Sequence, residues 1–249
     1  MKTQLKLGST IMHGVGGPQA GSIAIIYEFL LAQCHENHYS YISVNQIDET
    51  LDEVIVKMNR NEIYVNVRYP ADPGFENLES IVQQQTRLDI MHLGLSRIAE
   101  HERKLSLDNL NTINAMILKN KFHFEFTAKT FPHPNNPGLQ AQLSIIPDLK
   151  KFDFFLSVLE DEKEKCRVHL YEGGTTTYYF GYFFSNAKWK GERELIISGS
   201  DKTIEIHILL DSCEVSFEPS TLPENAPFEI FRANRAIRNT YGTVDFKAP

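Results

Sequence analysis

The chain has 249 residues, of which 42% are hydrophobic and 23% are charged. Those proportions are ordinary for globular proteins, so they exclude a disordered or collagen-like chain. The formal net charge of −7 argues against a nucleic-acid partner, because nucleic-acid-binding proteins need a cationic surface to displace counterions.

The cysteines and the apolar runs indicate in which cellular compartment the protein is expected and whether it is expected to contact a membrane. Cys34, Cys166 and Cys213 are far apart, odd in number and without a C-x-x-C spacing. This pattern predicts neither a disulfide framework nor a zinc site, and we therefore expect a cytoplasmic protein. The apolar run from Ile23 to Leu31 contains Glu28 and is too short to cross a bilayer, so we expect no membrane partner.

The first part of the chain predicts one helix and then short strands. Apolar residues at three- and four-residue spacing predict a helix from Pro18 to Cys34, and Tyr39 to Val44 is typical of a strand. The segment from Ile47 to Met58 fits either the apolar stripe of a helix or a β-hairpin. We favour a hairpin for its second half, because Asn59-Arg60-Asn61 suits a tight turn. The return strand, Ile63 to Tyr69, alternates strictly between apolar and polar residues.

Two helices and two strands are expected next. Periodic apolar residues predict helices from Glu76 to Arg103 and from Leu107 to Lys119, the second with Ser106 as its N-cap. The hydrophobic period then changes to two. This change predicts two antiparallel strands on either side of the proline- and asparagine-rich loop at 132–138.

The C-terminal part predicts a helix followed by an antiparallel meander. Asp148 is the expected cap of a helix that contains Leu149 to Leu159 and ends in the charged run Glu160 to Lys165. A last helix is expected from Phe228 to Asn239. The predicted strands between them are Cys166–Glu172, Thr175–Phe184, Glu192–Ser198, Thr203–Leu210 and Cys213–Phe217.

These elements together predict an α+β protein with a predominantly antiparallel sheet and a few amphipathic helices. We expect residues 1–249 to form a single structural unit. Its best internal boundary is the loop at 132–138. If the unit has two lobes, they are a mixed α/β lobe at 1–131 and the meander with its C-terminal helix at 139–249.

Motifs that carry catalytic chemistry are weak. The glycine-rich segment Gly14 to Ser22 precedes a predicted helix and echoes a phosphate-binding loop, but the lysine of such a loop is absent. Cys34, His35 and His38 form a C-H-x-x-H cluster without a second cluster to complete a metal site, so we expect a surface turn there. We therefore expect no catalytic residue, no cofactor and no metal.

Acidic and aromatic residues supply the surface expected to bind a partner. Carboxylates gather at 48–53 and at 160–164, where they would steer a basic partner. Residues 178–184 place aromatic side chains on both faces of one predicted strand, which either fills a core or offers anchors to a partner. The predicted partner-binding residues are Asp48, Glu49, Asp52, Glu53, Glu160, Asp161, Tyr178 and Tyr182.

We therefore expect a non-catalytic protein-binding protein, most concretely a toxin-neutralising immunity-type inhibitor whose partner is a basic toxin or effector. Such an inhibitor needs only a complementary surface, which explains the lack of a site motif. Two alternatives stay open. One is a divergent hydrolase with a site near the Gly14–Ser22 loop, and the other is a structural subunit that homo-oligomerises through residues 178–184.

Overall fold

The computed structural model divides the chain into two compact units. The first comprises residues 1–124 and 147–150, and the second comprises residues 125–146 and 151–249. Three α-helices and twelve strands lie in the described ranges, which confirms the predicted α+β class. Whether the two units act as one structural unit stays a prediction. The structure describes residues 3–11, 14–16, 20–36, 38–148, 151–173, 184–199 and 205–218.

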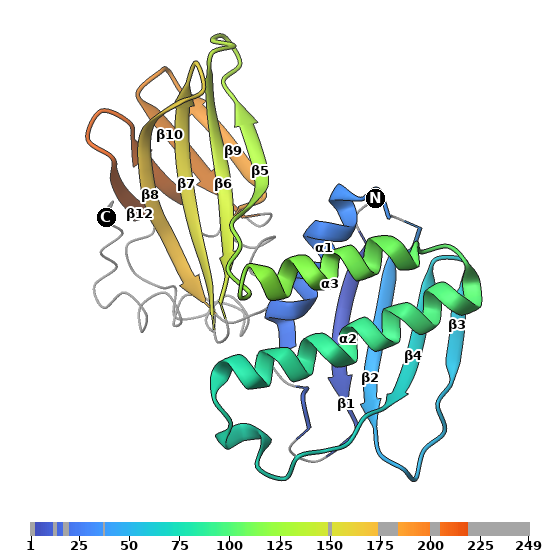
Figure 1. The fold of residues 1–249 in the computed structure, drawn as a ribbon. Coiled ribbons are helices and arrows are strands. Elements are labelled where there is room, and N and C mark those ends of the chain that lie inside the picture. The colour runs from blue at the N-terminus through green and yellow to red at the C-terminus, as the bar shows by residue number, and fades with distance from the viewer. Residues whose placement is uncertain are drawn as a thin grey trace. The chain divides into compact units, whose positions relative to one another are not determined.

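The first unit contains a four-stranded sheet in the order β1-β2-β4-β3 (Figure 1). Strands β1 (Gln4–Ser9), β2 (Tyr41–Ile47) and β4 (Glu62–Arg68) are parallel. Strand β3 (Ile55–Asn59) pairs antiparallel with β4, which confirms the predicted hairpin. The sequence did not predict β1, because a parallel pair joins segments that are distant in the chain and leaves no local turn signal.

Three helices cover one face of this sheet. Helix α1 (Gly21–Gln33) contacts β1, whereas α2 (Ser80–Glu102) contacts β2 and β4. Helix α3 (Leu107–Lys119) packs against both α1 and α2. Figure 1 shows α2 and α3 lying across the strands. The side chain of Ser106 accepts a hydrogen bond from the backbone N–H of Asn109, which confirms the predicted N-cap.

The core of the first unit lies between the helices and the sheet. The inward residues of β4, Ile63, Val65 and Val67, are buried as their alternation predicted. Helix α2 approaches the sheet closely at Gly94. A Cβ atom at this position would lie 2.5 Å from Cγ1 of Val44, so only glycine permits this helix–sheet distance.

The second unit contains two four-stranded antiparallel sheets. The first, in the order β5-β6-β7-β8, comprises Phe126–Pro132, Leu139–Pro147, Phe152–Glu160 and Lys163–Gly173. The second, in the order β12-β11-β10-β9, lies behind the first in Figure 1. Apolar side chains of both sheets are buried, as in a β-sandwich. From β9 to β12, the strands of the second sheet are Asn186–Lys190, Glu194–Ser198, Glu205–Leu209 and Glu214–Glu218.

The helix predicted from Leu149 to Leu159 is wrong, because this region contains strand β7. Its apolar residues fit a helical stripe, but alternate positions from Phe152 to Val158 are buried on the inward face. The charged run that was expected to end a helix contains a tight hairpin turn, between the last residue of β7 and the start of β8. Asp161 and Glu162 have φ angles of 49° and 65°, as the central residues of a type I′ turn require.

Most of the other strands predicted in the C-terminal part are present in the structure. Strands β8, β10, β11 and β12 overlap the segments predicted from residue 166 to 217. The antiparallel pairing of β9 to β12 confirms the C-terminal meander, whereas β8 belongs to the other sheet. Strand β9 was not predicted. Apart from Phe184, the strand predicted at 175–184 lies outside the described residues, as does the helix predicted at 228–239.

Cys166 on β8 and Cys213 in the turn before β12 form a disulfide, with their Cα atoms 5.7 Å apart. The expectation that the cysteines form no disulfide is therefore wrong. The two are 47 residues apart in sequence, and only the packing of the two sheets brings them together. Disulfides are typical of oxidising compartments and are rare in the cytoplasm. The predicted cytoplasmic location therefore stays a prediction. No helix in the described part of the chain has the length and apolar character needed to cross a membrane.

Candidate functional site

The predicted partner-binding residues belong to different parts of the fold. Asp48 to Glu53 form the loop between β2 and β3 in the first unit, whereas Glu160 and Asp161 lie at the β7–β8 turn of the second. Tyr178 and Tyr182 lie outside the described residues. The acidic loop adjoins the outermost strand of its sheet. We call residues 48–59, which comprise this loop and β3, the β3 edge.

The outer side of β3 has no strand partner among the described residues. Asn66 N donates to the carbonyl of Val54 (2.9 Å), so alternate residues of β3 bond to β4. The residues between them, Ile55 and Lys57, direct their backbone N–H and C=O groups away from β4. Exposed backbone groups of this kind can accept an added strand from another chain.

Exposed apolar side chains concentrate on the same segment. Leu51, Val54, Val56 and Met58 are exposed by 44%, 41%, 44% and 63%. These four are among only ten large hydrophobic side chains exposed in the described residues, and they lie within eight consecutive positions. Isolated apolar residues are common on protein surfaces, whereas a contiguous group marks an interaction site.

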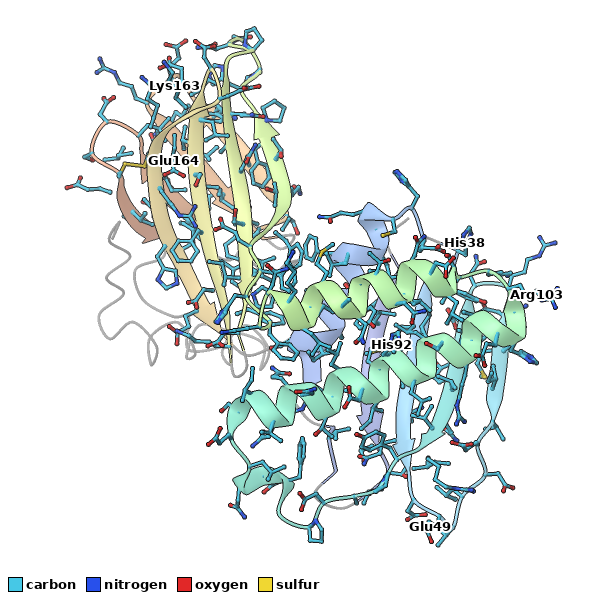
Figure 2. The ribbon with its side chains drawn as sticks, in the orientation of Figure 1. His38, Glu49, His92, Arg103, Lys163 and Glu164 are labelled. Atoms are coloured by element: carbon cyan, nitrogen blue, oxygen red, sulfur yellow. A yellow bond between two sulfur atoms is a disulfide. The ribbon has the colours of Figure 1, made fainter. Side chains whose placement is uncertain are left out.

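The carboxylates of the loop have two kinds of role. The hydroxyl and backbone N–H of Thr50 bond to Asp48 and lower its pKa. Arg97 of α2 binds Glu53 (2.6 Å) and is the main cause of the lowered pKa of Glu53. Glu49 and Asp52 are exposed and form no ion pair with a described residue; Figure 2 shows Glu49 at the far end of the loop. These two carboxylates are therefore free to face a partner.

An open groove of about 610 Å³ lies beside the strand, between β3, β4 and α2. Two ion pairs connect α2 to the β3 edge: Arg97 with Glu53, and Glu102 with Lys57, at 2.6 Å each. They hold the loop and strand in place against the helix. The groove is lined by Glu53, Val54, Ile55, Val65, Asn66, Arg97, Glu100 and His101.

A smaller cavity of about 240 Å³ borders the glycine-rich segment at the carboxyl ends of the parallel strands. Gln46, which is 1% exposed, accepts hydrogen bonds from Ser9 Oγ (2.9 Å) and Val15 N (3.0 Å). Arg87 Nε donates to the carbonyl of Val15 (3.1 Å). These hydrogen bonds hold the described part of the glycine-rich segment against the sheet. Its polar contacts therefore have a structural role.

Described side chains of the kinds that a hydrolase would need as nucleophile and base, Ser22, Cys34 and His92, occupy separate local structures. The Ser22 hydroxyl donates to the carbonyl of Asp148. Burial, and then the charge of Glu36, raise the pKa of Cys34 and so favour its unreactive thiol. His92 Nδ1 lies 3.0 Å from the hydroxyl of buried Tyr27. No contact joins Ser22, Cys34 and His92 in the described part of the chain, and the hydrolase alternative stays a prediction.

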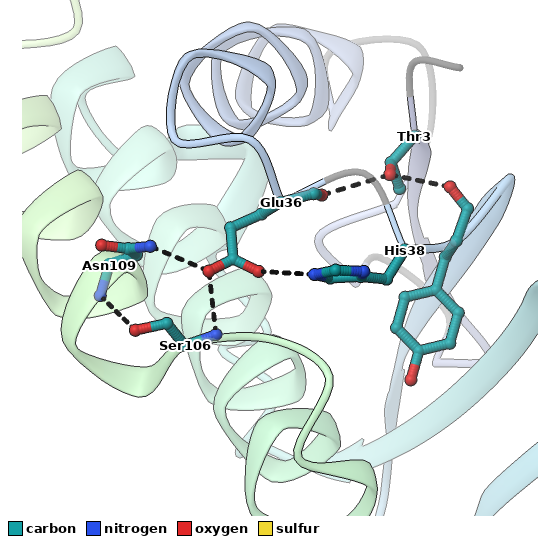
Figure 3. A network of polar contacts seen from close by, with 6 residues as sticks. Thr3, Glu36, His38, Ser106 and Asn109 are labelled. Atoms are coloured by element: carbon teal, nitrogen blue, oxygen red, sulfur yellow. Dashed lines mark hydrogen bonds and ion pairs between the residues drawn. The ribbon is translucent and has the colours of Figure 1, made fainter.

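The C-H-x-x-H segment connects two helices (Figure 3). Buried Glu36 accepts hydrogen bonds from Ser106 N (3.1 Å) and Asn109 Nδ2 (2.8 Å), at the start of α3. His38 Nε2 lies 3.6 Å from the other carboxylate oxygen. The polar groups of this segment therefore join the end of α1 to the start of α3.

The acidic loop was predicted, but the exposed apolar strand beside it was not. Val54, Val56 and Met58 resemble core residues in sequence, and their exposure follows only from the place of β3 at the edge of the sheet. The pattern Val54-Ile55-Val56 beside four carboxylates was the available signal. No protein-family model matches this sequence, and no curated protein matches it.

Proposed function

We propose that this protein is a non-catalytic binding protein that receives an extended segment of a basic partner protein at the β3 edge. One observation carries the proposal. A strand edge and two carboxylates that have no partner among the described residues occur together with exposed apolar side chains in twelve residues. A toxin-neutralising immunity-type inhibitor is its most concrete form, since such an inhibitor needs no catalytic group.

The backbone supports an extended partner. Ile55 and Lys57 offer outward N–H and C=O groups, which an added strand would satisfy. Val56 and Met58 offer apolar contact area beside those groups. Main-chain hydrogen bonds would supply affinity, whereas side-chain contacts would supply specificity.

The charge distribution supports a basic partner. Glu49 and Asp52 are exposed on the loop, and Glu100 lines the adjoining groove. Because the whole chain carries a net charge of −7, its field also attracts a cationic protein. Carboxylates at the rim of an interface raise the association rate more than the affinity, and salt weakens this effect.

The test uses the full ¹⁵N-labelled chain and a synthetic peptide of alternating valine and lysine as the probe. We expect shifts and slower hydrogen exchange at the amides of Ile55 and Lys57, because their N–H groups would bond to the peptide. Val56→Lys and Met58→Lys should each weaken binding by about tenfold, about 1.4 kcal/mol. A double Glu49→Gln, Asp52→Gln variant should slow association at low salt.

Met116→Lys is the matched control, because Met116 is an exposed apolar residue (39%) on α3, away from β3. Its peptide affinity should stay within about twofold of the wild type. Thermal unfolding of each variant separates a loss of binding from a loss of folding. Equal weakening by Met116→Lys, or unchanged amides at Ile55 and Lys57, would sink the proposal.

Self-association is the competing outcome, because two β3 edges can also pair with each other. Mass measurements over a dilution series decide between the two. A dimer that dissociates on dilution and is abolished by Val56→Lys would replace the basic partner with a second copy of this chain. Oligomerisation through residues 178–184 stays a separate prediction, since most of that segment lies outside the described residues.

A further inference from the structure

A second group of ionisable side chains lies on adjacent strands of the second unit. Glu205 and His207 are two residues apart on β11 and therefore share one face of the sheet. Glu218 on β12 is the direct register partner of Glu205. One ligand atom from each of the three residues lies within 4.8 Å of the other two. An imidazole nitrogen and two carboxylate oxygens thus surround a common point.

A fourth residue orients the imidazole. Nδ1 of His207 lies 2.8 Å from Oε1 of Glu194 on β10. Glu194 also forms an ion pair with Lys190 (3.1 Å). Because an ionised carboxylate only accepts hydrogen bonds, Nδ1 carries a proton. In the neutral ring the lone pair is therefore on Nε2.

That lone pair is buried and has no hydrogen-bond partner. The nearest ion-pair contact of Nε2 is Oε2 of Glu205, at 3.7 Å, but both atoms are acceptors when the ring is neutral. Leaving a buried polar atom without a hydrogen-bond partner destabilises the folded state. Glu205 and Glu218 add a further cost, because like charges directly opposite each other destabilise a sheet.

We propose that Glu205, His207 and Glu218 bind one divalent transition-metal ion, with Zn²⁺ as the favoured ion, and that Glu194 orients the His207 ligand. A single cation satisfies the Nε2 lone pair and also neutralises the two opposed carboxylates. A carboxylate on the second nitrogen of a ligating histidine is the usual outer-shell partner in metal sites. The imidazole ligand favours Zn²⁺ over Ca²⁺ or Mg²⁺, which prefer oxygen ligands.

Three protein ligands leave at least one coordination position of Zn²⁺ for water or for a group from another molecule. The site thus differs from the closed four-ligand sites that only stabilise a fold. It also departs from the sequence-based expectation of no metal, which rested on Cys34, His35 and His38. The cluster was not recognisable in sequence, since the β11–β12 register alone brings Glu218 to His207.

The test measures Zn²⁺ binding to the full, disulfide-bonded chain by calorimetry, together with the visible spectrum of the Co²⁺ form. We expect a site with nitrogen and oxygen ligands whose affinity falls at least tenfold in His207→Ala, Glu205→Gln and Glu218→Gln. Glu194→Ala should weaken binding by about 10- to 100-fold, since it removes only the outer-shell partner. Binding should also weaken as the pH falls, because protons compete for the ligands.

His169→Ala is the matched control. His169 also sits on a strand beside a carboxylate, with Nε2 2.9 Å from Asp153, but it is not part of the three-ligand cluster. Its substitution should leave Zn²⁺ affinity within about twofold. A Cys34→Ser variant removes the free thiol as a competing ligand.

Two outcomes would overturn the metal site. The first is no stoichiometric Zn²⁺ binding at neutral pH. The second is equal affinity in wild type and His207→Ala. Should His207→Ala fail to fold, Glu205→Gln and Glu218→Gln, which keep the side-chain shape, give the same readout. Zn²⁺ should raise the unfolding temperature of wild type but not of these two variants.

Discussion

The two units differ in how much they rely on buried polar side chains that bond to distant backbone groups. In the second unit, buried His133 has its Nε2 3.1 Å from the carbonyl oxygen of Gly191. In the first unit, buried polar side chains bond to backbone groups of distant segments. Glu28 accepts from Leu5 N (2.8 Å), Gln46 from Val15 N, and Arg87 donates to the carbonyl of Val15. Each of these three side chains is at most 6% exposed.

In the second unit, charged residues pair across strands on partly exposed faces. His169 lies 2.9 Å from Asp153, and Arg167 binds Glu125 with its two contacts at 2.9 and 3.0 Å. The ring of Phe155 stacks on His169 and lies under the Arg167 guanidinium. The core beneath is almost wholly apolar, and a disulfide links β8 to the turn before β12.

This difference follows from strand direction. Antiparallel strands joined by tight turns satisfy most of their own backbone groups, whereas parallel strands need crossovers whose ends leave backbone groups to be satisfied by side chains. The first unit should therefore be sensitive to single buried polar residues. The second should be sensitive to its disulfide and tolerant of changes to its surface pairs.

The largest expected effect is on the second unit, from Cys213→Ser. Loss of a cross-link that closes a loop of 47 residues should lower the free energy of unfolding by about 4 kcal/mol in the chain-entropy model. The single tryptophan, Trp189 on β9, reports this unit by fluorescence during urea unfolding. Cys34→Ser is the control and should change little. A loss as small as that of the control would mean that sheet packing alone holds the unit.

The next effect is on the first unit, from Gln46→Leu. This change removes the acceptor of Val15 N and the donor to the carbonyl of Tyr69, so buried backbone groups lose their partners. We expect a loss of about 3 kcal/mol. The helical circular-dichroism signal reports this unit, because all the described α-helices belong to it. Gln142→Leu on β6 is the matched control, and a loss there as large as for Gln46→Leu would break the contrast between the units.

Gly94→Ala should have a smaller effect on the same unit. The added Cβ would lie 2.5 and 2.8 Å from the two methyl carbons of Val44, which forces α2 or the side chain to move. We expect a loss of about 2 kcal/mol, again measured by the helical signal. A Val44→Ala, Gly94→Ala double variant should recover part of that loss. No recovery would show that the cost arises elsewhere than at this contact.

The smallest effect concerns Glu53→Gln at the β3 edge. Glu53 and Arg97 are 30% and 33% exposed, so their pair should contribute less than about 1 kcal/mol. Because Arg97, and then the backbone N–H of Arg68, lower the pKa of Glu53, its contribution is present above the unperturbed value of 4.5. The contribution is lost as the pH falls through the lower pKa of the folded state.

Urea unfolding at about pH 7 and about pH 3 checks this dependence. The difference between wild type and Glu53→Gln should shrink at the lower pH, where the wild-type carboxylate is increasingly protonated. Glu49→Gln is the control, since Glu49 is exposed and forms no ion pair with a described residue. A difference that does not change with pH would assign the loss to packing instead of charge.

Local patterns predicted those elements whose signals are complete within a few residues. The bounds of α3 and its Ser106 cap, the β3–β4 hairpin and the alternation of β4 were all readable in sequence. Strand β7 was misread because its apolar residues satisfy a helical period as well as alternation, and only the covering sheet selects the strand. The Cys166–Cys213 pair was missed because it depends on how the two sheets pack.

By itself, the sequence determined the α+β class, the acidic loop at 48–53 and most of the meander, because hydrophobic period, turn residues and charge are local properties. Tertiary structure alone decided that β3 lies at an edge and that Arg97 binds Glu53, whereas Glu49 forms no ion pair with a described residue. It alone also placed Glu218 beside Glu205. Strand order and register join residues that are distant along the chain, so no short segment encodes them.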